Sequence, residues 1–253
     1  MRAVSTKDPY SSSVNDQLSF DLDDQLPWAQ NLAVFDLETT GLDLEEARIV
    51  TACAVAIDAS GQVTGSNKEW LADPGIDIPE AASNVHGVTT EMARSKGRNS
   101  AEVVAEILDT LRGFFAQGIP VVAYNAPYDF TILHYEALRN GLEPLANPQP
   151  IIDPMVIDKF VDTYRSGKRT LQVAATIYGV GLSDAHNATA DAIAAGKVAQ
   201  AIARKYSSKL PSDAFELHNA QVGWSLAQDD SYENFRRKSS PEFSAVRGWP
   251  LKL

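Results

Sequence analysis

Short apolar runs separated by turn residues characterise the chain just after residue 30. The run Leu32-Ala-Val-Phe-Asp-Leu37 ends at Thr39-Thr40-Gly41, which is typical of a buried strand stopped by a turn. Two more strands are expected at about 49–58 and 63–71, joined by the turn-rich residues 59–62. Together these segments predict an antiparallel meander.

Apolar residues at helical spacing follow the meander. They predict an amphipathic helix over 99–117, through Val103, Val104, Ile107, Leu108, Leu111 and Phe115. Asn99 and Glu102 could form its N-terminal capping box. We expect strands at 119–124 and 150–153, and helices at 127–140, 170–178 and 187–206. A strand, a helix and a strand in that order predict a parallel crossover.

These elements predict one α/β domain over residues 31–206, with a mixed five-stranded sheet flanked by helices. Residues 1–30 lack sustained periodicity and are expected to form a disordered tail. Residues 207–253 are expected to form a helical extension and a tail, with Ser212 and Glu216 near the helix start. A length of 253 residues fits one catalytic domain better than two.

Charge and composition narrow the function classes. The net charge of -11 has the wrong sign for a protein that coats long nucleic acids, so any grip on nucleic acid should be local. The single cysteine, Cys53, excludes an intramolecular disulfide. The N-terminal residues do not resemble a signal peptide, and no run is long enough to span a bilayer. We therefore expect a cytoplasmic protein.

Two acids stand together at the end of the first strand. Asp36 and Glu38 are two residues apart, so their side chains should leave the same face, about 7 Å apart. Like charges leaving a core raise each other's pKa unless a cation or a donor compensates them. Oxygen ligands favour Mg²⁺ or Mn²⁺, and no Cys/His cluster is available for zinc. The alternative is a pair of exposed acids at a strand end.

Two more acids occupy element ends. Asp129 falls where a predicted strand hands over to a helix, and Asp191 opens the last long helix of the domain. Ligands of α/β proteins gather at such strand ends. The four acids are placed as expected if the fold brings them together.

Three ordered motifs carry a family resemblance. Phe35-Asp36-Leu37-Glu38-Thr39-Thr40-Gly41, Asn125-Ala-Pro-Tyr-Asp129, and His186 followed five residues later by Asp191 resemble those of the DEDDh exonucleases. This family includes the proofreading subunit of bacterial DNA polymerase III, ribonuclease T and oligoribonuclease. Tyr124 departs from the pattern, because polymerase-associated members often carry His before the Asn; this affects the subfamily more than the chemistry.

The resemblance implies a ribonuclease H-like fold and a two-metal site. Asp36, Glu38, Asp129 and Asp191 would hold two divalent ions, Mg²⁺ or Mn²⁺, with Asp36 bridging both. His186 occupies the family's place for the group that takes a proton from the attacking water, a task that suits an imidazole near neutral pH. A solvated loop histidine is the alternative.

Substrate contacts also follow from the resemblance. Thr39 and Thr40 would meet the terminal nucleotide through their backbone, and Leu42 would wedge beside its base. The remaining expected substrate contacts are His86 in a His-Gly loop, Asn125, and Tyr128 as a stacking face. The basic cluster of Arg165, Lys168 and Arg169 could contact phosphate, although a solvated charged turn is nearly as plausible.

Three functions remain open at this point. The leading hypothesis is a 3′–5′ exonuclease acting on single-stranded or frayed DNA ends, alone or with a polymerase. The alternatives are an RNA 3′ exonuclease or oligoribonuclease, and a non-catalytic module of the same fold that binds nucleic acid or a partner. The sequence does not decide between DNA and RNA.

The apolar island 17–22 in the N-terminal tail resembles peptides that dock on the bacterial sliding clamp, with Phe20 in place of the usual Leu or Met. Its other interpretation, a stray patch that folds back onto the domain, is favoured by the degeneracy of short motifs.

Overall fold

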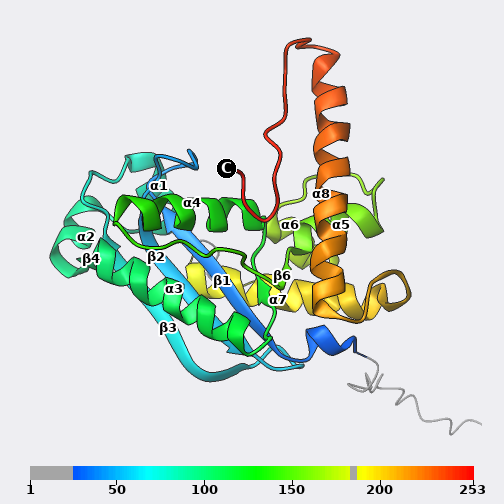
Figure 1. Cartoon of the computed structure of the whole chain (residues 1–253), viewed down its shortest axis with the longest axis horizontal. Coiled ribbons are helices and arrows are strands. Elements are labelled where there is room, and N and C mark those ends of the chain that lie inside the picture. Colours follow the sequence, from blue (N-terminus) through cyan, green and yellow to red (C-terminus); the bar gives the residue numbers. More distant parts are fainter. Residues whose placement is uncertain (1–24, 183–186) are drawn as a thin grey trace, which may run out of the picture.

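A mixed sheet forms the centre of the computed structural model, which describes residues 25–182 and 187–253 (Figure 1). Its strand order is β4-β3-β2-β1-β5-β6. The strands are β1 (Leu32–Thr39), β2 (Ile49–Ile57), β3 (Val63–Asp73), β4 (Arg98–Asn99), β5 (Val121–Val122) and β6 (Ile151–Ile152).

The pairing confirms the expected meander followed by parallel strands. β1 pairs antiparallel with β2, β2 pairs antiparallel with β3, and β5 and β6 continue the sheet in parallel beyond β1. The described sheet has one strand more than the five expected, because β4 adds a parallel edge beside the end of β3. β4 is only two exposed polar residues long, so it carries no apolar pattern that could have predicted it.

Helices cover both faces of the sheet (Figure 1). The helices expected from the sequence are present, and three short ones, α1, α2 and α5, were not expected because seven or eight residues show too little periodicity. No described helix is long and apolar enough to cross a membrane. The helices are α1 (Glu80–His86), α2 (Thr90–Lys96), α3 (Ser100–Ala116), α4 (Ala126–Arg139), α5 (Pro154–Val161), α6 (Leu171–Ile177), α7 (Ala188–Lys205) and α8 (Ala214–Arg237), with 3-10 turns at Pro27–Ala29 and Ser207–Lys209.

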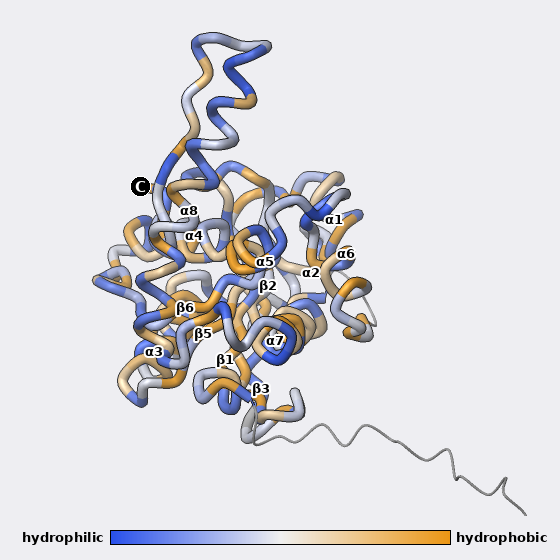
Figure 2. Tube along the Cα trace, turned by 90° about the vertical axis from the view of Figure 1, so that its right-hand side faces the viewer, coloured by the Kyte–Doolittle hydropathy of each residue, from blue (hydrophilic) through white to orange (hydrophobic). Residues whose placement is uncertain are grey.

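Alternation along β1 separates two apolar cores. Val34 belongs to the core beneath α7, whereas Phe35 points to the core beneath α3 and α4 and packs against Phe130. Gly196 lets α7 approach the sheet closely, because a Cβ there would lie 2.5 Å from Val34 Cγ1 and 2.6 Å from Ile57 Cδ1. Figure 2 shows hydrophobic residues concentrated on β5, β6 and α7 at the centre of the molecule.

Packing at the N-terminal end starts earlier than the expected residue 31. Trp28 is 3% exposed and its indole N–H donates to the Pro211 carbonyl at 3.0 Å. The segment just before β1 is therefore part of the fold and is joined to the chain that follows α7.

The C-terminal extension is a long helix and a returning segment. α8 projects from the body, and the chain after it runs back toward the sheet (Figure 1). At its base, His218 Nδ1 accepts from Ile151 N at 3.1 Å, and the Gln221 amide accepts from Asp153 N at 2.7 Å and donates to Ile151 O at 3.0 Å. The extension therefore closes the β6 edge of the sheet.

Candidate active site

Four carboxylates meet beside the end of β1. Asp36 and Glu38 are both part-exposed on β1, Asp129 lies in the first turn of α4, and Asp191 lies in the first turn of α7. The pKa of Asp36 is raised well above its usual value by burial first, and then by the charges of Asp129, Glu38 and Asp191. Each of the other three acids is therefore near enough to Asp36 to interact with it.

The parallel pairing of β1 with β5 brings these acids together. The chain leaves β5 and turns into α4 through Asn125, the helix N-cap, which has left-handed dihedral angles (φ 65°, ψ 51°). This turn places Asp129 against β1, where Leu37 N donates to Asp129 Oδ1 at 3.0 Å. One backbone hydrogen bond thus ties the second motif to the first.

Burial and mutual repulsion raise the pKa values of the carboxylates on β1 and α4. The pKa of Glu38 is raised to about 7, by burial first and then by the charge of Asp191. Burial also raises the pKa of Asp129, although the hydrogen bond from Leu37 opposes that shift. No three potential ligands among the described residues already surround a common point. The donor set still fits a hard divalent cation, because it consists of carboxylate oxygens gathered at one place.

His186 lies outside the described residues, which resume at Asn187. Its role as proton acceptor therefore stays a prediction. Asn187 caps α7, since its side chain accepts from Thr189 N and Ala190 N at 3.1 and 3.2 Å. This cap places Asp191 in the first helical turn, directly after the segment that carries His186.

Side-chain hydrogen bonds fix the backbone of the turn after β1. Thr39 Oγ1 lies 2.5 Å from the Tyr128 hydroxyl, and both hydroxyls donate to the Gly41 carbonyl, at 2.8 and 2.9 Å. Burial raises the pKa of Tyr128 to about 12, so this hydroxyl stays protonated near neutral pH. Thr40 is buried and exchanges hydrogen bonds with the Arg48 backbone. Tyr128 therefore positions the turn, a role that the sequence did not suggest.

Leu42 and His86 frame this turn. Leu42 is 86% exposed, as a residue that wedges beside a nucleotide must be. His86 Nδ1 accepts from Val88 N at 3.2 Å, so the neutral ring carries its proton on Nε2. Burial lowers the pKa of His86, and the neighbouring Thr39 backbone opposes that shift. His86 is thus a neutral group beside the turn, on the wall of a 370 Å³ pocket that also reaches Asn187.

The expected phosphate contacts at Arg165 and Arg169 are corrected by the structure. Both guanidinium groups bind the fully buried carboxylate of Asp158, at 2.5 and 2.7 Å. Their side chains are only 10% and 14% exposed. They neutralise the buried charge of Asp158 inside the fold. The sequence could not show this pairing, because Asp158 lies on α5, a short helix that was not expected. Lys168 is exposed and remains a candidate for phosphate contact.

Asp153 is a site residue that sequence reasoning missed. Its carboxylate is fully buried and accepts from Asn125 N, Ala126 N and Met155 N, each at 3.0 Å, and from Trp249 Nε1 at 3.3 Å. It holds the start of α4, and its charge also raises the pKa of Asp129. The available signal was an Asp directly before Pro154, which is typical of a helix N-cap.

Fold and site together define a class of protein: an α/β enzyme with a carboxylate cluster at the end of its first strand. A model of the Exonuclease family, RNase_T, matches residues 33–199. The chain belongs to this family and is a DnaQ-like DEDDh exonuclease. The expected ribonuclease H-like fold is confirmed by solved structures.

Relatives include bacterial polymerase proteins. The chain is 28% identical over 203 residues to "DNA polymerase III PolC-type" of Pediococcus pentosaceus, covering 80% of this chain and 13% of that protein. It is 34% identical over 129 residues to "DNA polymerase III subunit epsilon-like protein" of Rhodobacter capsulatus, covering 51% of this chain and 17% of that protein. The chain thus spans less than a fifth of the length of these relatives.

Solved structures of exonuclease I share the fold. E. coli exonuclease I in complex with a dA16 oligonucleotide superposes with a TM-score of 0.60 at 19% identity, covering 74% of this chain and 42% of that one. The zinc-bound E. coli exonuclease I complex with single-stranded DNA gives the same TM-score at 22% identity, covering 70% and 41%.

Proposed function

We propose that the protein is a metal-dependent 3′–5′ exonuclease that releases nucleoside monophosphates from DNA 3′ ends. The observation that carries the proposal is the group of four acids, Asp36, Glu38, Asp129 and Asp191, whose charges raise the pKa of Asp36 beside the end of β1. Repulsion among grouped carboxylates is relieved when a divalent cation binds between them.

The four acids would hold two divalent ions, Mg²⁺ or Mn²⁺. Bound ions of this kind neutralise charge on the attacking and leaving oxygens of a phosphoryl displacement and acidify the attacking water. His186 would accept the proton of that water. The Leu37 backbone and the Asn125 turn would hold Asp129 in place during the reaction.

The turn after β1 would recognise the strand end. Its backbone is fixed by the hydroxyls of Thr39 and Tyr128, so it offers preorganised groups to a terminal 3′ hydroxyl. Leu42, at its exposed tip, would pack beside the terminal base. Lys168 and Asn125 would complete the contacts with the terminal nucleotide and its phosphate.

DNA is the substrate that we favour, because the relatives are DNA polymerase proteins and the solved neighbours include complexes with single-stranded DNA. The decisive experiment digests matched DNA and RNA oligonucleotides, labelled at the 5′ end, with Mg²⁺ or with a chelator. We expect a ladder that shortens from the 3′ end of DNA and requires Mg²⁺. Faster digestion of RNA would favour the RNA exonuclease, and binding of both without cleavage would favour the non-catalytic module.

A replication or repair partner is a separate part of the proposal. The clamp-like segment 17–22 lies outside the described residues, so only binding can test it. A peptide of residues 14–24 should bind purified sliding clamp at micromolar concentration, and Gln17→Ala with Phe20→Ala should abolish that binding. Failure of the native peptide to bind would leave a free-standing exonuclease.

A further inference from the structure

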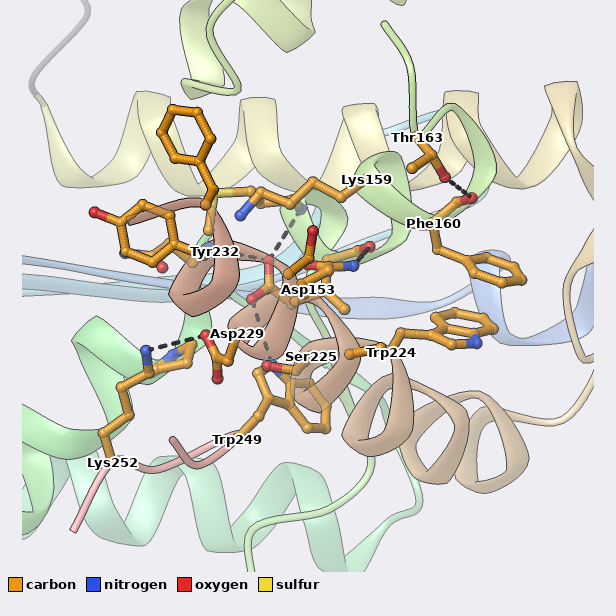
Figure 3. A pocket seen from close by; sticks show the side chains of 18 residues that line it. Asp153, Lys159, Phe160, Thr163, Trp224, Ser225, Asp229, Tyr232, Trp249 and Lys252 are labelled. Atoms are coloured by element: carbon orange, nitrogen blue, oxygen red, sulfur yellow. Dashed lines mark hydrogen bonds and ion pairs between the residues drawn. The ribbon is translucent and has the colours of Figure 1, made fainter. Parts of the chain in front are cut away.

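A cleft of about 850 Å³ opens between α5, α8 and the C-terminal segment (Figure 3). Asn125 and Pro127, at the start of α4, line it. Asp153 lines it too, and is near enough to the catalytic carboxylate Asp129 for its charge to raise that group's pKa. The cleft therefore adjoins the carboxylate cluster. α8 and the C-terminal segment lie beyond residue 199, so much of its wall is outside the exonuclease family match.

Aromatic rings line this cleft and remain open to solvent. Phe235 is 65% exposed, Tyr232 is 47% exposed and Phe160 is 39% exposed. Phe160 stacks on Trp224 with ring centroids 3.8 Å apart and the planes 7° apart, which presents a flat double ring at one side (Figure 3). Exposed rings of this size cost free energy in water unless something covers them.

Lys159 supplies a positive charge whose donors are not engaged. It lies on α5 and lines the cleft, and burial lowers the pKa of its ammonium group. An ammonium group has three N–H donors, and within the described residues Lys159 Nζ forms no hydrogen bond or ion pair, although the charges of Asp153 and Asp229 act to raise its pKa. A second ammonium, that of Lys252, is 3.9 Å from Asp229 Oδ1. The Lys159 ammonium group can therefore take up an anion, whereas that of Lys252 already faces the Asp229 carboxylate.

Asp229 supplies a hydrogen-bond acceptor, in contrast to the N–H donors of the two lysines. Its side chain is 18% exposed, and Asp229 Oδ2 is buried without a hydrogen-bond partner among the described residues. Figure 3 shows Asp229 beside Lys252 and Tyr232, across the cleft from the stacked rings of Phe160 and Trp224. An unused acceptor at this depth favours a ligand that brings N–H donors.

We propose that this cleft binds the nucleotides of a single strand that lie upstream of the 3′ end in the active site. The proposal rests on the exonuclease function and extends it. A phosphate would lie at Lys159, bases would stack on the exposed rings of Tyr232 and Phe235, and the N–H groups of a base edge would donate to Asp229. The cleft thus offers a partner for each of three features of a nucleotide: its phosphate, the flat face of its base and the N–H groups at the edge of the base.

A protein segment is the competing occupant. We favour a nucleic acid strand because the start of α4, through Asn125 and Pro127, joins the cleft to the carboxylate cluster, so one strand would reach both. In this otherwise acidic chain, with a net charge of -11, the cleft lining balances its two carboxylates, Asp153 and Asp229, with the two ammonium groups of Lys159 and Lys252. An ammonium group beside exposed rings is what a short, local grip on a strand requires.

The test compares a long and a minimal substrate in the full-length protein with Mg²⁺. The variants are Phe235→Ala and Lys159→Gln, and their matched controls on and just after α8 are Phe215→Ala and Lys238→Gln, exposed positions that do not line the cleft. We expect KM for a 12-nucleotide DNA to rise at least about fivefold in each cleft variant. Hydrolysis of the p-nitrophenyl ester of thymidine 5′-monophosphate, which cannot reach the cleft, should not change.

Salt dependence gives an independent measurement. Loss of one phosphate contact should reduce the slope of log affinity against log salt by about 0.7 in Lys159→Gln and leave it unchanged in Lys238→Gln. An unchanged KM and slope in both cleft variants would overturn the proposal and leave the cleft to a protein segment. Failure of the parent protein to hydrolyse even the small ester would instead overturn the exonuclease function, so the two failures are distinguishable.

Discussion

Replacing Asp153 with asparagine tests whether one buried carboxylate holds the catalytic end of α4. Oδ1 accepts from Asn125 N and Met155 N, and Oδ2 accepts from Ala126 N and Trp249 Nε1. A carboxamide keeps one oxygen and places an NH₂ group where the other was. Either the part-buried donors Asn125 N and Met155 N or the buried donors Ala126 N and Trp249 Nε1 then lose their acceptor, depending on how the amide is turned.

The magnitude follows from these two donors. A buried donor left unsatisfied costs about 1–3 kcal/mol, so the substitution should cost roughly 2–6 kcal/mol of the free energy of unfolding. A neutral amide offsets part of this cost, because burial raises the pKa of Asp153 and so disfavours its charged form. We therefore expect the lower half of that range, a large share of the roughly 5–15 kcal/mol typical of a domain.

Urea denaturation followed by circular dichroism measures this loss. The matched control is Asp213→Asn, the exposed N-cap of α8, which should change stability by less than about 0.5 kcal/mol because Asn and Asp cap helices equally well. The folded variant should also lose kcat, since the turn at Asn125 and the carboxylate of Asp129 are no longer held. Equal unfolding free energies for Asp153→Asn and its control would refute the reasoning.

Three further predictions concern charge, the proton acceptor and packing. Glu38 has a raised pKa, so the folded state binds more protons than the unfolded chain between about pH 4.5 and 7. With chelator present, the melting temperature should therefore fall as the pH rises through that window. Glu38→Gln should make this fall smaller. His186→Ala should lose at least about 100-fold in kcat while retaining substrate affinity, and a parental rate across neutral pH would place the proton acceptor elsewhere. Gly196→Ala should destabilise the fold by about 1–3 kcal/mol in urea melts, because its Cβ would meet Val34 and Ile57; Gly113→Ala, with open space around it on α3, should be neutral or stabilising.

The parts of the fold that could be predicted are the elements that bury several side chains, because their apolar residues follow a recognisable pattern in the sequence. β1 and α3 bury several residues each, so a continuous apolar run identified the strand and helical spacing identified the helix. α1 buries none of its residues and α2 buries only Ala93, so neither could show an apolar stripe. Trp28 looked like part of a polar tail because its packing partner, Pro211, lies 183 residues away.

The site residues also divide into those that the sequence could predict and those that it could not. The sequence predicted that Asp36 and Asp129 would lie near each other, because local turns at strand ends set their positions. Arg169 was misassigned because its partner, Asp158, is recognisable only once α5 is buried. Asp153 was missed for a related reason: three of its four donors come from the starts of α4 and α5, and the fourth comes from Trp249, 96 residues along the chain.

The C-terminal extension is physically part of the catalytic end of the domain. β6 is a two-residue edge strand, and an unpaired edge leaves backbone donors and acceptors without partners. His218 and Gln221 of α8 supply those partners at Ile151 and Asp153, and Trp249 reaches the Asp153 carboxylate from the returning segment. Asp153 in turn holds the start of α4, four residues before Asp129. Any change that lifts α8 from β6 must therefore leave several buried polar groups unpaired, and the resulting loss of stability affects the segment that carries Asp129, the acid to which we assign a catalytic role.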